Sequence, residues 1–577
     1  MACKAGLRFY RQMAILRTDG TAMPQTVDEL LAAKAFANVV DRFLKERREA
    51  LDLHDVPRLE FDLTLRTLCH TALSEAQVTW PAHCRDDERR GRLHEVAEEL
   101  YDFWRSFERF LVLIDADTDD HRGFKDTINH LNHLVRKAYR EICENITAER
   151  PRVYRQVAAG FQVGIIARPE QLPIPPGYGN LAAIPRIRQV LLNPPLVIDP
   201  PETKRTGEFA RVTRNPLHGL RLPTDRYLMY PARVGDLLIF IYFHDQFIDL
   251  GCALSNLFEL ASDEECRRKP DAIYVYGAPA ACFADGDEPT IFHEDDQHNV
   301  LTAAVPLSDR YGYFGYLKKM VLTLHNIIMM KRGRMPAHGA FVRLRLRGRD
   351  PVGVLLIGDT GAGKSESIEA FRALADASIQ RMTVVFDDMG SLEETPEGIV
   401  AYGTEIGAFV RLDDLSPGYA LGNIDRSIIM NPHKTNARLV IPITSMRDIL
   451  HGHRVDYLLY ANNFEHLDAA HPILERFTTP EAALAVFREG TAMSKGTTTH
   501  TGLTHAYFAN IFGPSQYKEL HEGIATRMFA AAFRHGVFVG QLRTRLGIAG
   551  YATEGPRAAA AALLELLGCQ GATPNAE

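Results

Sequence analysis

The sequence predicts an α/β protein with a helical region at its N-terminus. Apolar residues recur with a helical period up to about residue 150. Shorter runs rich in β-branched and aromatic residues follow, and one of them leads into a glycine-rich phosphate-binding motif. Because 577 residues exceed one ordinary hydrophobic core, we expect several domains. We predict an all-α domain at residues 1–155, an α/β lobe at residues 156–345 and a P-loop nucleotide-binding lobe at residues 346–577.

Composition and charge indicate a globular protein whose partners are small molecules or other proteins. Hydrophobic residues make up 46% and charged residues 24%, and the formal net charge of -7 offers no basic surplus for nucleic acid. The longest apolar run, residues 237–243, is far too short to cross a membrane. Eight cysteines without C-x-x-C spacing fit thiols in a reducing compartment. We therefore expect a cytoplasmic protein that binds neither nucleic acid nor membrane.

The N-terminal region is predicted to be helical because its apolar residues fall on one face of a helix at a time. Thr26 and Glu29 have the spacing of a capping box at the start of the first helix. Three apolar stripes follow: Leu31, Ala35, Val39 and Phe43; Val96, Leu100, Phe103, Phe107 and Phe110; and Ile128, Leu131, Leu134, Val135, Ala138 and Ile142. We interpret these stripes as a helical core, and we expect this domain to be the part that binds a protein partner.

The pattern changes after residue 160. Residues 165–201 are rich in proline and turn signals, which predicts a linker or an irregular start to the next domain. Residues 237–243, 272–276 and the alternating run 341–347 are typical of strands.

A phosphate-binding loop is the most informative motif of the chain. The string Gly358-Asp359-Thr360-Gly361-Ala362-Gly363-Lys364-Ser365 fits G-x-x-x-x-G-K-[ST] and follows the apolar residues 354–357. Glycines let successive backbone N–H groups point at an anion, and a helix starting near Lys364 adds the positive end of its dipole. Lys364 would reach the β- and γ-phosphates of ATP, and Ser365 would bind the Mg²⁺ of the nucleotide.

Two adjacent carboxylates follow the next β-branched run. Residues 383–386 read as a strand that leads into Asp387 and Asp388, as in a Walker B motif. Acids at the carboxyl end of a strand beside a phosphate loop can hold a metal ion or its water. A solvated Asp-Asp turn is the alternative.

Further segments accompany the loop in a fixed order. They are YFGYLKKM at 313–320, MPAHG at 335–339, GTEIGAFVR at 403–411, KTNARLVIPI at 434–443, FREGTAMSKGT at 487–497 and FG at 512–513. With the phosphate loop and the aspartate pair, this order and spacing resemble ATP-dependent phosphoenolpyruvate carboxykinase over about residues 300–565. The Gly-Lys-Ser-Glu ending of the loop is also similar to HPr kinase/phosphorylase, which acts on a protein serine. The resemblance implies a two-lobed mixed-sheet catalytic core, to which this chain adds its N-terminal all-α domain.

The resemblance also implies roles for individual residues. Lys319, His338 and Asp388 would bind a catalytic divalent metal, usually Mn²⁺ in the family. A lysine can donate a lone pair at neutral pH only if nearby cations lower its pKa, and the metal and Lys318 could both do so.

The phosphoryl acceptor and the transferring group would meet three further residues. Tyr313 would face the acceptor, and Arg438 would bridge the acceptor and the γ-phosphate. Arg411 stands where the family usually has lysine and could neutralise the transferring group, while Lys364 and Asp387 complete the expected catalytic set.

Three functions remain open at this point. The first is the carboxykinase reaction, in which oxaloacetate and ATP give phosphoenolpyruvate, ADP and CO₂. The Gly-Arg-Ser-Pro-like motif that clamps the substrate carboxylate in the family is not found here, although arginines at 205, 211, 214, 221, 226 and 233 crowd the corresponding region. The second function is therefore a kinase of the same superfamily that phosphorylates another small molecule or a protein hydroxyl. The third is a nucleotide-sensing regulator with little turnover.

Overall fold

The computed structural model describes residues 6–20, 23–53, 57–70, 87–114, 121–155, 157–359, 361–374, 379–412, 415, 417–494 and 502–568. The chain divides into two compact units. The first comprises Met1–Gln171, Ala183–Leu196 and Pro223–Leu228, and the second comprises Leu172–Ala182, Val197–Leu222 and Met229–Glu577. Both units contain helices and strands, so the protein has the mixed α/β architecture that the sequence predicts.

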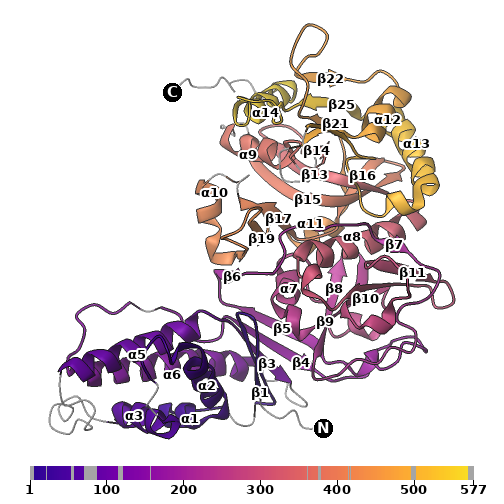
Figure 1. The fold of residues 1–577 in the computed structure, drawn as a ribbon. Coiled ribbons are helices and arrows are strands. Elements are labelled where there is room, and N and C mark those ends of the chain that lie inside the picture. Colours follow the sequence, from indigo (N-terminus) through magenta and orange to yellow (C-terminus); the bar gives the residue numbers. More distant parts are fainter. Residues whose placement is uncertain are drawn as a thin grey trace. The chain divides into compact units, whose positions relative to one another are not determined.

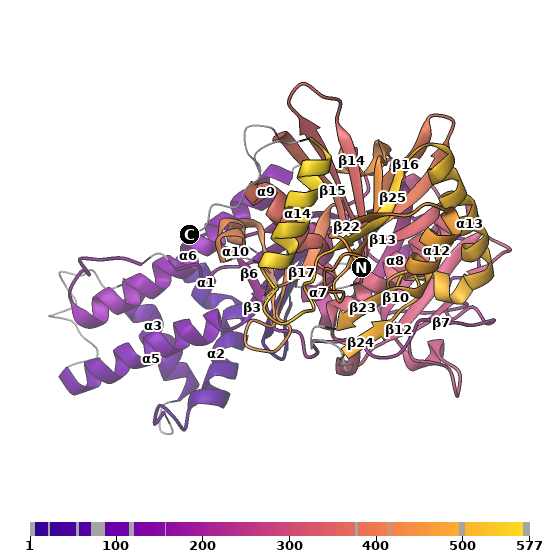
Figure 2. The same ribbon diagram turned by 90° about the horizontal axis from the view of Figure 1, so that it is seen from above.

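The first unit packs helices against five neighbouring strands of a sheet. Its strands are β1 (Gly6–Tyr10), β2 (Met13–Thr18), β3 (Glu108–Ile114), β4 (Val163–Arg168) and β5 (Arg186–Leu192), in the order β1-β2-β3-β4-β5. Its helices are α1 (Val27–Ala32), α2 (Lys34–Arg47), α3 (Arg58–His70), α5 (Asp87–Arg105) and α6 (His121–Thr147). The helices lie to one side of the strands (Figure 1, Figure 2).

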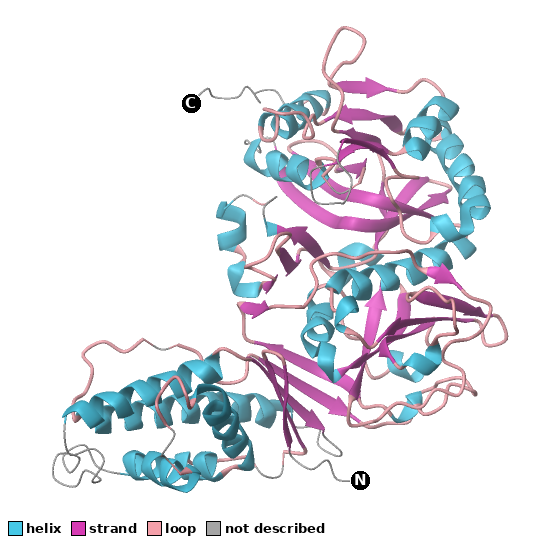
Figure 3. Cartoon of the chain, viewed as in Figure 1, coloured by secondary structure: helices cyan, strands magenta, loops and turns pink. Residues whose placement is uncertain are grey.

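The prediction of an all-α N-terminal domain is wrong, because the described part of this region contains strands (Figure 3). The apolar pattern places the whole stripe ending at Phe110 in one helix, but α5 ends at Arg105 and Phe110 lies in strand β3. A buried strand of seven residues carries a continuous apolar run, which periodicity alone cannot distinguish from a helix segment. The hairpin of β1 and β2 was missed for the same reason, since it is short and largely apolar.

Most residues of the helical stripes are buried, whereas Ala35, Leu100 and Val135 are half-buried. The side chain of Thr26 accepts a hydrogen bond from Glu29 N at 3.2 Å and caps α1. Ala33 leaves the helical conformation, so the first stripe is divided between α1 and α2. Phe43 and Phe103 pack with ring centroids 5.5 Å apart in the core that α2, α3, α5 and α6 share.

Residues 165–201 are more regular than the predicted linker. They contain the end of β4, all of β5 and the short strand β6 (Leu196–Ile198). The proline and turn residues lie mainly between β4 and β5, where they connect two antiparallel strands. The strand predictions at 237–243, 272–276 and 341–347 are confirmed by β9 (Leu237–His244), β10 (Ala272–Ala278) and β13 (Met335–Leu346).

The second unit contains several sheets. In one of them, six neighbouring strands follow the order β8 (Tyr227–Val234), β9, β10, β12 (Val300–Pro306), β11 (Ile291–Asp295) and β7 (Ala210–Arg211). A smaller one has the order β17 (Gly407–Arg411), β19 (Arg438–Pro442), β18 (Ile428–Met430) and β6, and a hairpin pairs β23 (Thr491–Ser494) with β24 (Gly502–His505).

An eight-stranded mixed sheet carries most of the predicted site. Its order is β20 (His453–Arg454), β16 (Gly398–Gly403), β15 (Ile379–Thr395), β13, β14 (Val352–Ile357), β21 (Tyr457–Asn462), β25 (Phe538–Arg543) and β22 (Leu474–Arg476). The helices of this unit are α7 (Ile248–Ala253), α8 (Phe314–Lys331), α9 (Lys364–Leu374), α10 (Pro417–Gly422), α11 (Met446–Leu450), α12 (Pro480–Glu489), α13 (Lys518–Arg534) and α14 (Glu554–Leu566).

Helices α9 and α14 cover one part of this sheet through a shared apolar core. Phe371 of α9 and Leu563 of α14 are completely buried against Leu356 and Leu459 of the parallel strands β14 and β21. This packing fixes the start of α9 at the end of β14, where the phosphate loop connects them. Within the described residues, no helix combines the length and apolar character that a membrane crossing requires.

Candidate active site

The phosphate loop connects β14 to α9 and turns through two glycines. Gly361 has φ 79° and Gly363 has φ 94°, conformations that residues with a Cβ atom rarely adopt. A Cβ atom at Gly363 would also lie only 2.7 Å from Thr544 Oγ1. The glycines of the motif are therefore required by backbone geometry and by close packing.

Lys364 is buried at the first position of α9. Its ammonium group donates hydrogen bonds to the carbonyl oxygens of Gly358 at 2.6 Å and Asp359 at 2.9 Å. A bound phosphate could replace these two carbonyls as the partner of the cation. Thr360, which belongs to the predicted loop, lies outside the described residues.

Two side chains make hydrogen bonds to carbonyl oxygens of the phosphate loop. Asn463, fully buried, donates to the Gly361 carbonyl oxygen at 2.9 Å. Thr544 donates to the Ala362 carbonyl oxygen at 2.7 Å. These bonds use carbonyl groups of the loop and fix the position of its backbone.

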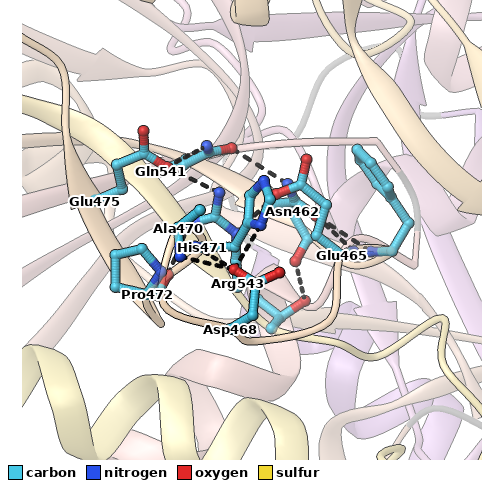
Figure 4. Close-up of polar contacts among 11 residues, drawn as sticks. Asn462, Glu465, Asp468, Ala470, His471, Pro472, Glu475, Gln541 and Arg543 are labelled. Carbon is cyan, nitrogen blue, oxygen red and sulfur yellow. Dashed lines mark hydrogen bonds and ion pairs between the residues drawn. The ribbon is translucent and has the colours of Figure 1, made fainter.

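A buried arginine stabilises the segments that carry these two side chains. Figure 4 shows Arg543 at the end of β25, where its Nε donates to Glu465 at 2.7 Å and one terminal nitrogen donates to Glu475 at 2.8 Å. The other terminal nitrogen donates to the Pro472 carbonyl oxygen at 2.7 Å. Since all three nitrogen atoms are satisfied, this network holds the loop between β21 and β22 against β25.

Strand pairing brings the metal-binding candidates together. In the antiparallel pair β13 and β15, Gly339 lies opposite Asp388 and is also opposite Ile357 of β14, next to the phosphate loop. A Cβ atom at Gly339 would lie 2.4 Å from the Leu356 carbonyl oxygen, so only glycine fits there. The aspartates were expected at the carboxyl end of a strand, but β15 continues to Thr395 and holds them near its middle.

Asp387 faces the phosphate loop. The Ser365 hydroxyl donates to its two carboxylate oxygens, at 3.0 and 3.1 Å. Burial raises the pKa of Asp387, although Lys364 and the Ser365 hydrogen bond oppose this shift. The serine and the carboxylate are therefore placed where the motif requires them for a nucleotide-bound magnesium ion.

His338 and Asp388 form an arrangement that fits a cation. The ring nitrogen Nδ1 of His338 is hydrogen-bonded to the carbonyl oxygen of Ala509, which can only accept, so Nδ1 carries the proton. In the neutral ring Nε2 then presents a lone pair, and it lies 3.1 Å from Asp388 Oδ1. Two acceptors at this separation need a proton or a metal ion between them, and imidazole with carboxylate is a common pair of metal ligands.

Lys318 is completely buried between two carboxylates. Its ammonium donates to Asp388 and lies 3.2 Å from Glu405. Burial alone would lower the pKa of Lys318, but Asp388 and Glu405 outweigh it and raise this pKa. Burial also raises the pKa of Glu405 to about 8, with Lys318 opposing the shift. Burial would also raise the pKa of Asp388, but Lys318 and His338 hold the pKa of Asp388 well below its ordinary range.

Lys319 differs from its neighbour. Burial, together with the nearby cations Arg205 and Arg438, lowers the pKa of Lys319 to about 8, although Asp388 opposes this shift. Its Nζ lies 4.7 Å from the centroid of the Phe512 ring and makes no hydrogen bond or ion pair with any described residue. A lysine with this pKa can supply a lone pair far more readily than an ordinary lysine.

Two arginines and a tyrosine come from other segments. Arg438 lies over the Phe409 ring, 5.0 Å from its centroid, and its Nε is buried without a hydrogen-bond partner among the described residues. Arg411 lies directly opposite Arg438 in the pair β17 and β19. Tyr313 packs its ring 6.1 Å from Phe409.

A single cavity of about 160 Å³ joins these residues. The predicted residues that line it are Tyr313, Lys319, His338, Asp359, Gly361, Lys364, Ser365, Asp387, Asp388, Arg411 and Arg438. Gly358, Ala362 and Gly363 lie in the adjoining loop backbone. Its volume is below the roughly 300–1,000 Å³ that small-molecule pockets occupy.

Sequence reasoning missed several residues of this site. Lys318 was expected to lower the pKa of Lys319, but the nearby cations that lower it are Arg205 and Arg438. Glu405 was quoted only as part of a motif, and Arg205 was one of six candidate arginines. No local pattern marks Asn463 or Thr544, because they reach the loop from β-strand ends distant in sequence. The signal that was available is the paired lysine at 318 and 319, since two adjacent lysines in an apolar helix require partners.

A second group of potential metal ligands lies in the first unit. Ligand atoms of His94, Glu98 and Cys143 lie within 4.8 Å of one another. Burial, and then Glu98, raises the pKa of Cys143 to about 12, and Tyr139 donates to Glu98 at 2.6 Å. A protonated thiol is a poor ligand, so these residues fit a metal less well than those around Asp388.

No protein-family model matches the chain, and no curated protein shows significant similarity to its sequence.

Proposed function

We propose that the protein transfers the γ-phosphoryl group of ATP to a small anionic acceptor, in the manner of ATP-dependent phosphoenolpyruvate carboxykinase. One observation carries this proposal. Residues from widely separated segments, chosen from the sequence as phosphate, metal and acceptor ligands, line the same cavity. Chance placement of unrelated polar residues would not gather this set.

The donor side of the reaction depends on the loop and Lys364. The N–H groups of the loop and the start of α9 would bind the phosphates, and Lys364 would exchange its carbonyl partners for phosphate oxygens. Ser365 and Asp387 would hold the magnesium that accompanies ATP. Little covalent chemistry is needed, because positioning and charge neutralisation lower most of the barrier to phosphoryl transfer.

The metal-binding side depends on Lys319, His338 and Asp388. A divalent metal held by these residues would supply positive charge for the transferring group and the acceptor oxygen. The mixed nitrogen and oxygen donors suit Mn²⁺ or Mg²⁺. Lys318 would keep Asp388 ionised, and the Ala509 carbonyl, bound to Nδ1 of His338, would leave Nε2 as the nitrogen that binds the metal.

The acceptor side is positively charged, which favours an anionic substrate. Arg438 has a buried nitrogen without a partner among the described residues. The Nε of Arg205 is also buried without a hydrogen-bond partner among the described residues. Arg205 is close enough to Lys319 to lower its pKa. Carboxylates and phosphates match arginine donors, so Arg205 is our candidate for the carboxylate clamp that no sequence motif identified.

We further propose that the second unit has the two-lobed carboxykinase-like fold. The pairing of β13 with both β14 and β15, and the cavity between this sheet and the pair β17 and β19, support it.

The direct test is an assay with ATP, Mn²⁺ or Mg²⁺ and oxaloacetate, followed by measurement of phosphoenolpyruvate and ADP. We expect both products, and we expect Lys319→Met to abolish them while ATP still binds. ATP consumption only with other acceptors would replace oxaloacetate by another small molecule or a protein hydroxyl. Tight ATP binding without turnover under any condition, unchanged by Lys319→Met, would indicate a nucleotide-sensing regulator and contradict the proposal.

A further inference from the structure

The first unit contains a large cavity of its own. Its volume is about 550 Å³, within the range of roughly 300–1,000 Å³ that small-molecule sites occupy. Apolar side chains from several elements line it, among them Leu16, Val39, Leu100, Leu131, Val135 and Ile142. Protein interiors are packed with few voids larger than a water molecule. This cavity between the helices and the sheet is large enough to hold a small molecule.

The aromatic residues of the cavity wall present ring surfaces and not their polar atoms. Trp104 Nε1 donates to the Ala159 carbonyl oxygen at 2.6 Å, and the Tyr139 hydroxyl donates to Glu98 at 2.6 Å. The rings of Tyr101 and Tyr139 are stacked with centroids 3.8 Å apart. Because these polar groups already have protein partners, this part of the wall offers an apolar surface to a ligand.

The charged residues that line the cavity are all positive. Arg8 and Lys34 are the charged residues among those that line it, and no aspartate or glutamate of the described chain does. Arg8 pairs with Asp225 at 2.6 Å. Lys34 is exposed and marks where the cavity meets solvent.

One face of α2 carries two hydrogen-bond donors that have no partner among the described residues. Lys34 and Asn38 are one helical turn apart, both line the cavity, and neither makes a hydrogen bond or ion pair with any described residue. Helix α2 also begins at Lys34 without a side-chain cap and without an acidic residue in its first turn. The positive end of the helix dipole therefore adds to the charge of Lys34.

We propose that this cavity binds an amphipathic carboxylate, a small molecule with an apolar chain or ring system and one anionic head. The apolar body would occupy the space lined by the leucines and aromatic rings. The carboxylate would lie at the cavity mouth and accept hydrogen bonds from Lys34 and Asn38. The proposal is independent of phosphoryl transfer, because the cavity lies within the first unit and the candidate active site lies within the second.

Trp104 provides a direct probe of binding. The chain has two tryptophans, Trp80 and Trp104, so the variant Trp80→Phe leaves Trp104 as the sole source of tryptophan fluorescence. Titration of this full-length variant with dodecanoate, below the concentration at which dodecanoate aggregates, should change the emission in a saturable manner. Absence of any change would overturn the proposal.

The role of the charged head is tested with two lysines of the same helix. Lys34→Gln should weaken dodecanoate binding by about tenfold, the loss expected for one charge-assisted hydrogen bond. Lys45→Gln, which changes an exposed lysine that does not line the cavity, should leave the affinity unchanged. The neutral analogue dodecanol should bind the wild type and Lys34→Gln equally. Equal effects of the two lysine variants on dodecanoate would contradict the proposed position of the head.

The role of the cavity is tested with two alanines of α2. Both are half-buried, but only Ala35 lines the cavity. Ala35→Phe should reduce dodecanoate affinity at least about tenfold by filling ligand space, whereas Ala37→Phe should have little effect. The thermal unfolding temperature of each variant checks that it folds. Similar loss in both variants, with both folded, would overturn the proposal.

An apolar chain with an anionic head occurs both in free acids and in the anionic lipids of a bilayer. Co-sedimentation with phosphatidylglycerol vesicles separates these sources. We expect no vesicle binding by the wild type, since the head would be recognised inside a cavity mouth on one molecule at a time. Binding to vesicles without binding of free dodecanoate would contradict the proposal.

Discussion

Two cations of the second unit are buried between pairs of carboxylates, and their surroundings differ. Arg543 is 1% exposed and Lys318 is 0% exposed. The three nitrogen atoms of Arg543 donate to Glu465, Glu475 and the Pro472 carbonyl oxygen (Figure 4). Burial would raise the pKa of Glu475, but Arg543 lowers it, so this carboxylate stays ionised. The arginine cluster is a closed network in which every nitrogen of the guanidinium group has a protein acceptor.

The lysine cluster differs in the protonation of its groups. Asp388 has a strongly lowered pKa, while burial raises the pKa of Glu405 to about 8 and lowers that of the adjacent Lys319 to about 8. Groups that hold or lose protons near neutral pH, next to a buried carboxylate that stays ionised, are typical of sites that bind metals or react. Two buried ion pairs of similar appearance can therefore serve stability in one place and chemistry in another.

Arg543→Met should cause the largest loss of stability. Removing one partner of a buried ion pair typically costs roughly 3–5 kcal/mol, because the remaining charges lose their compensation. We expect that decrease in the free energy of unfolding, measured by urea denaturation. Lys318→Met should cost less, since Glu405 can remain protonated and only Asp388 loses its partner.

The order of the two variants should be reversed for catalysis, where Lys318→Met should have the larger effect. Below its denaturation midpoint, Arg543→Met should retain most of the phosphoryl transfer rate per folded molecule. Lys318→Met should lose it. Equal losses of stability and of rate in both variants would show that the clusters do not differ as we argue.

Asp388→Asn is expected to have the next largest effect. The amide keeps the size of the side chain but removes a charged ligand and the partner of Lys318. Loss of one charge that stabilises a transition state typically lowers kcat by about 100- to 1,000-fold. Steady-state measurement of ADP formation with Mn²⁺ checks this, and Glu465→Gln in the arginine cluster is the matched control that should leave kcat unchanged. A normal rate in Asp388→Asn would remove the metal site from the proposal.

The residues that the sequence singles out as a site lie together in the structure, whereas the strands of the N-terminal region were not predicted. A phosphate loop is a local device, so its glycines, Lys364 and Ser365 are visible as one string. His338 and Asp388 were identified only through a collinear pattern, because the contact between them depends on the register of β13 and β15. Arg205 could not be selected from its neighbours, since burial beside Lys319 is set by folding.

The length of each element explains what was missed in the fold. Helices such as α6 extend over many turns, and their period is unmistakable. Strand β3 is only seven residues long and buried, so it merges with the apolar stripe of the preceding helix. Whether Phe110 continues a helix or enters a sheet depends on pairing with β2 and β4, which are far away in sequence.

Gly363→Ala should weaken ATP binding by at least about tenfold, equivalent to roughly 1.4 kcal/mol. The added Cβ would approach Thr544 Oγ1 to 2.7 Å and would strain a backbone with φ 94°. Gly348→Ala is a matched control, because Gly348 also has positive φ but a Cβ atom added there would meet no described atom within 4 Å. Isothermal calorimetry with ATP measures both. Equal loss of affinity in both variants would mean that backbone strain elsewhere, and not the loop, is responsible.

Glu405→Gln should have the smallest effect, and its sign depends on pH. The pKa of Glu405 is raised from the ordinary 4.5 to about 8, so the folded protein binds a proton that the unfolded chain releases. The stability that this group contributes is fully present below pH 4.5 and is lost as the pH rises through about 8. Replacing it by glutamine should remove that decline and make the variant relatively more stable toward pH 8.

Glu475→Gln in the arginine cluster should behave in the opposite way. Because the pKa of Glu475 is lowered, its contribution is present above pH 4.5 and is lost as the pH falls. The variant should therefore be less stable than the wild type at about pH 7, and this difference should shrink toward about pH 4. Urea denaturation of the three proteins between about pH 4 and about pH 8.5 measures both slopes. Parallel pH dependence in the two variants would erase the distinction between the clusters, because the distinction consists in which carboxylate keeps its proton.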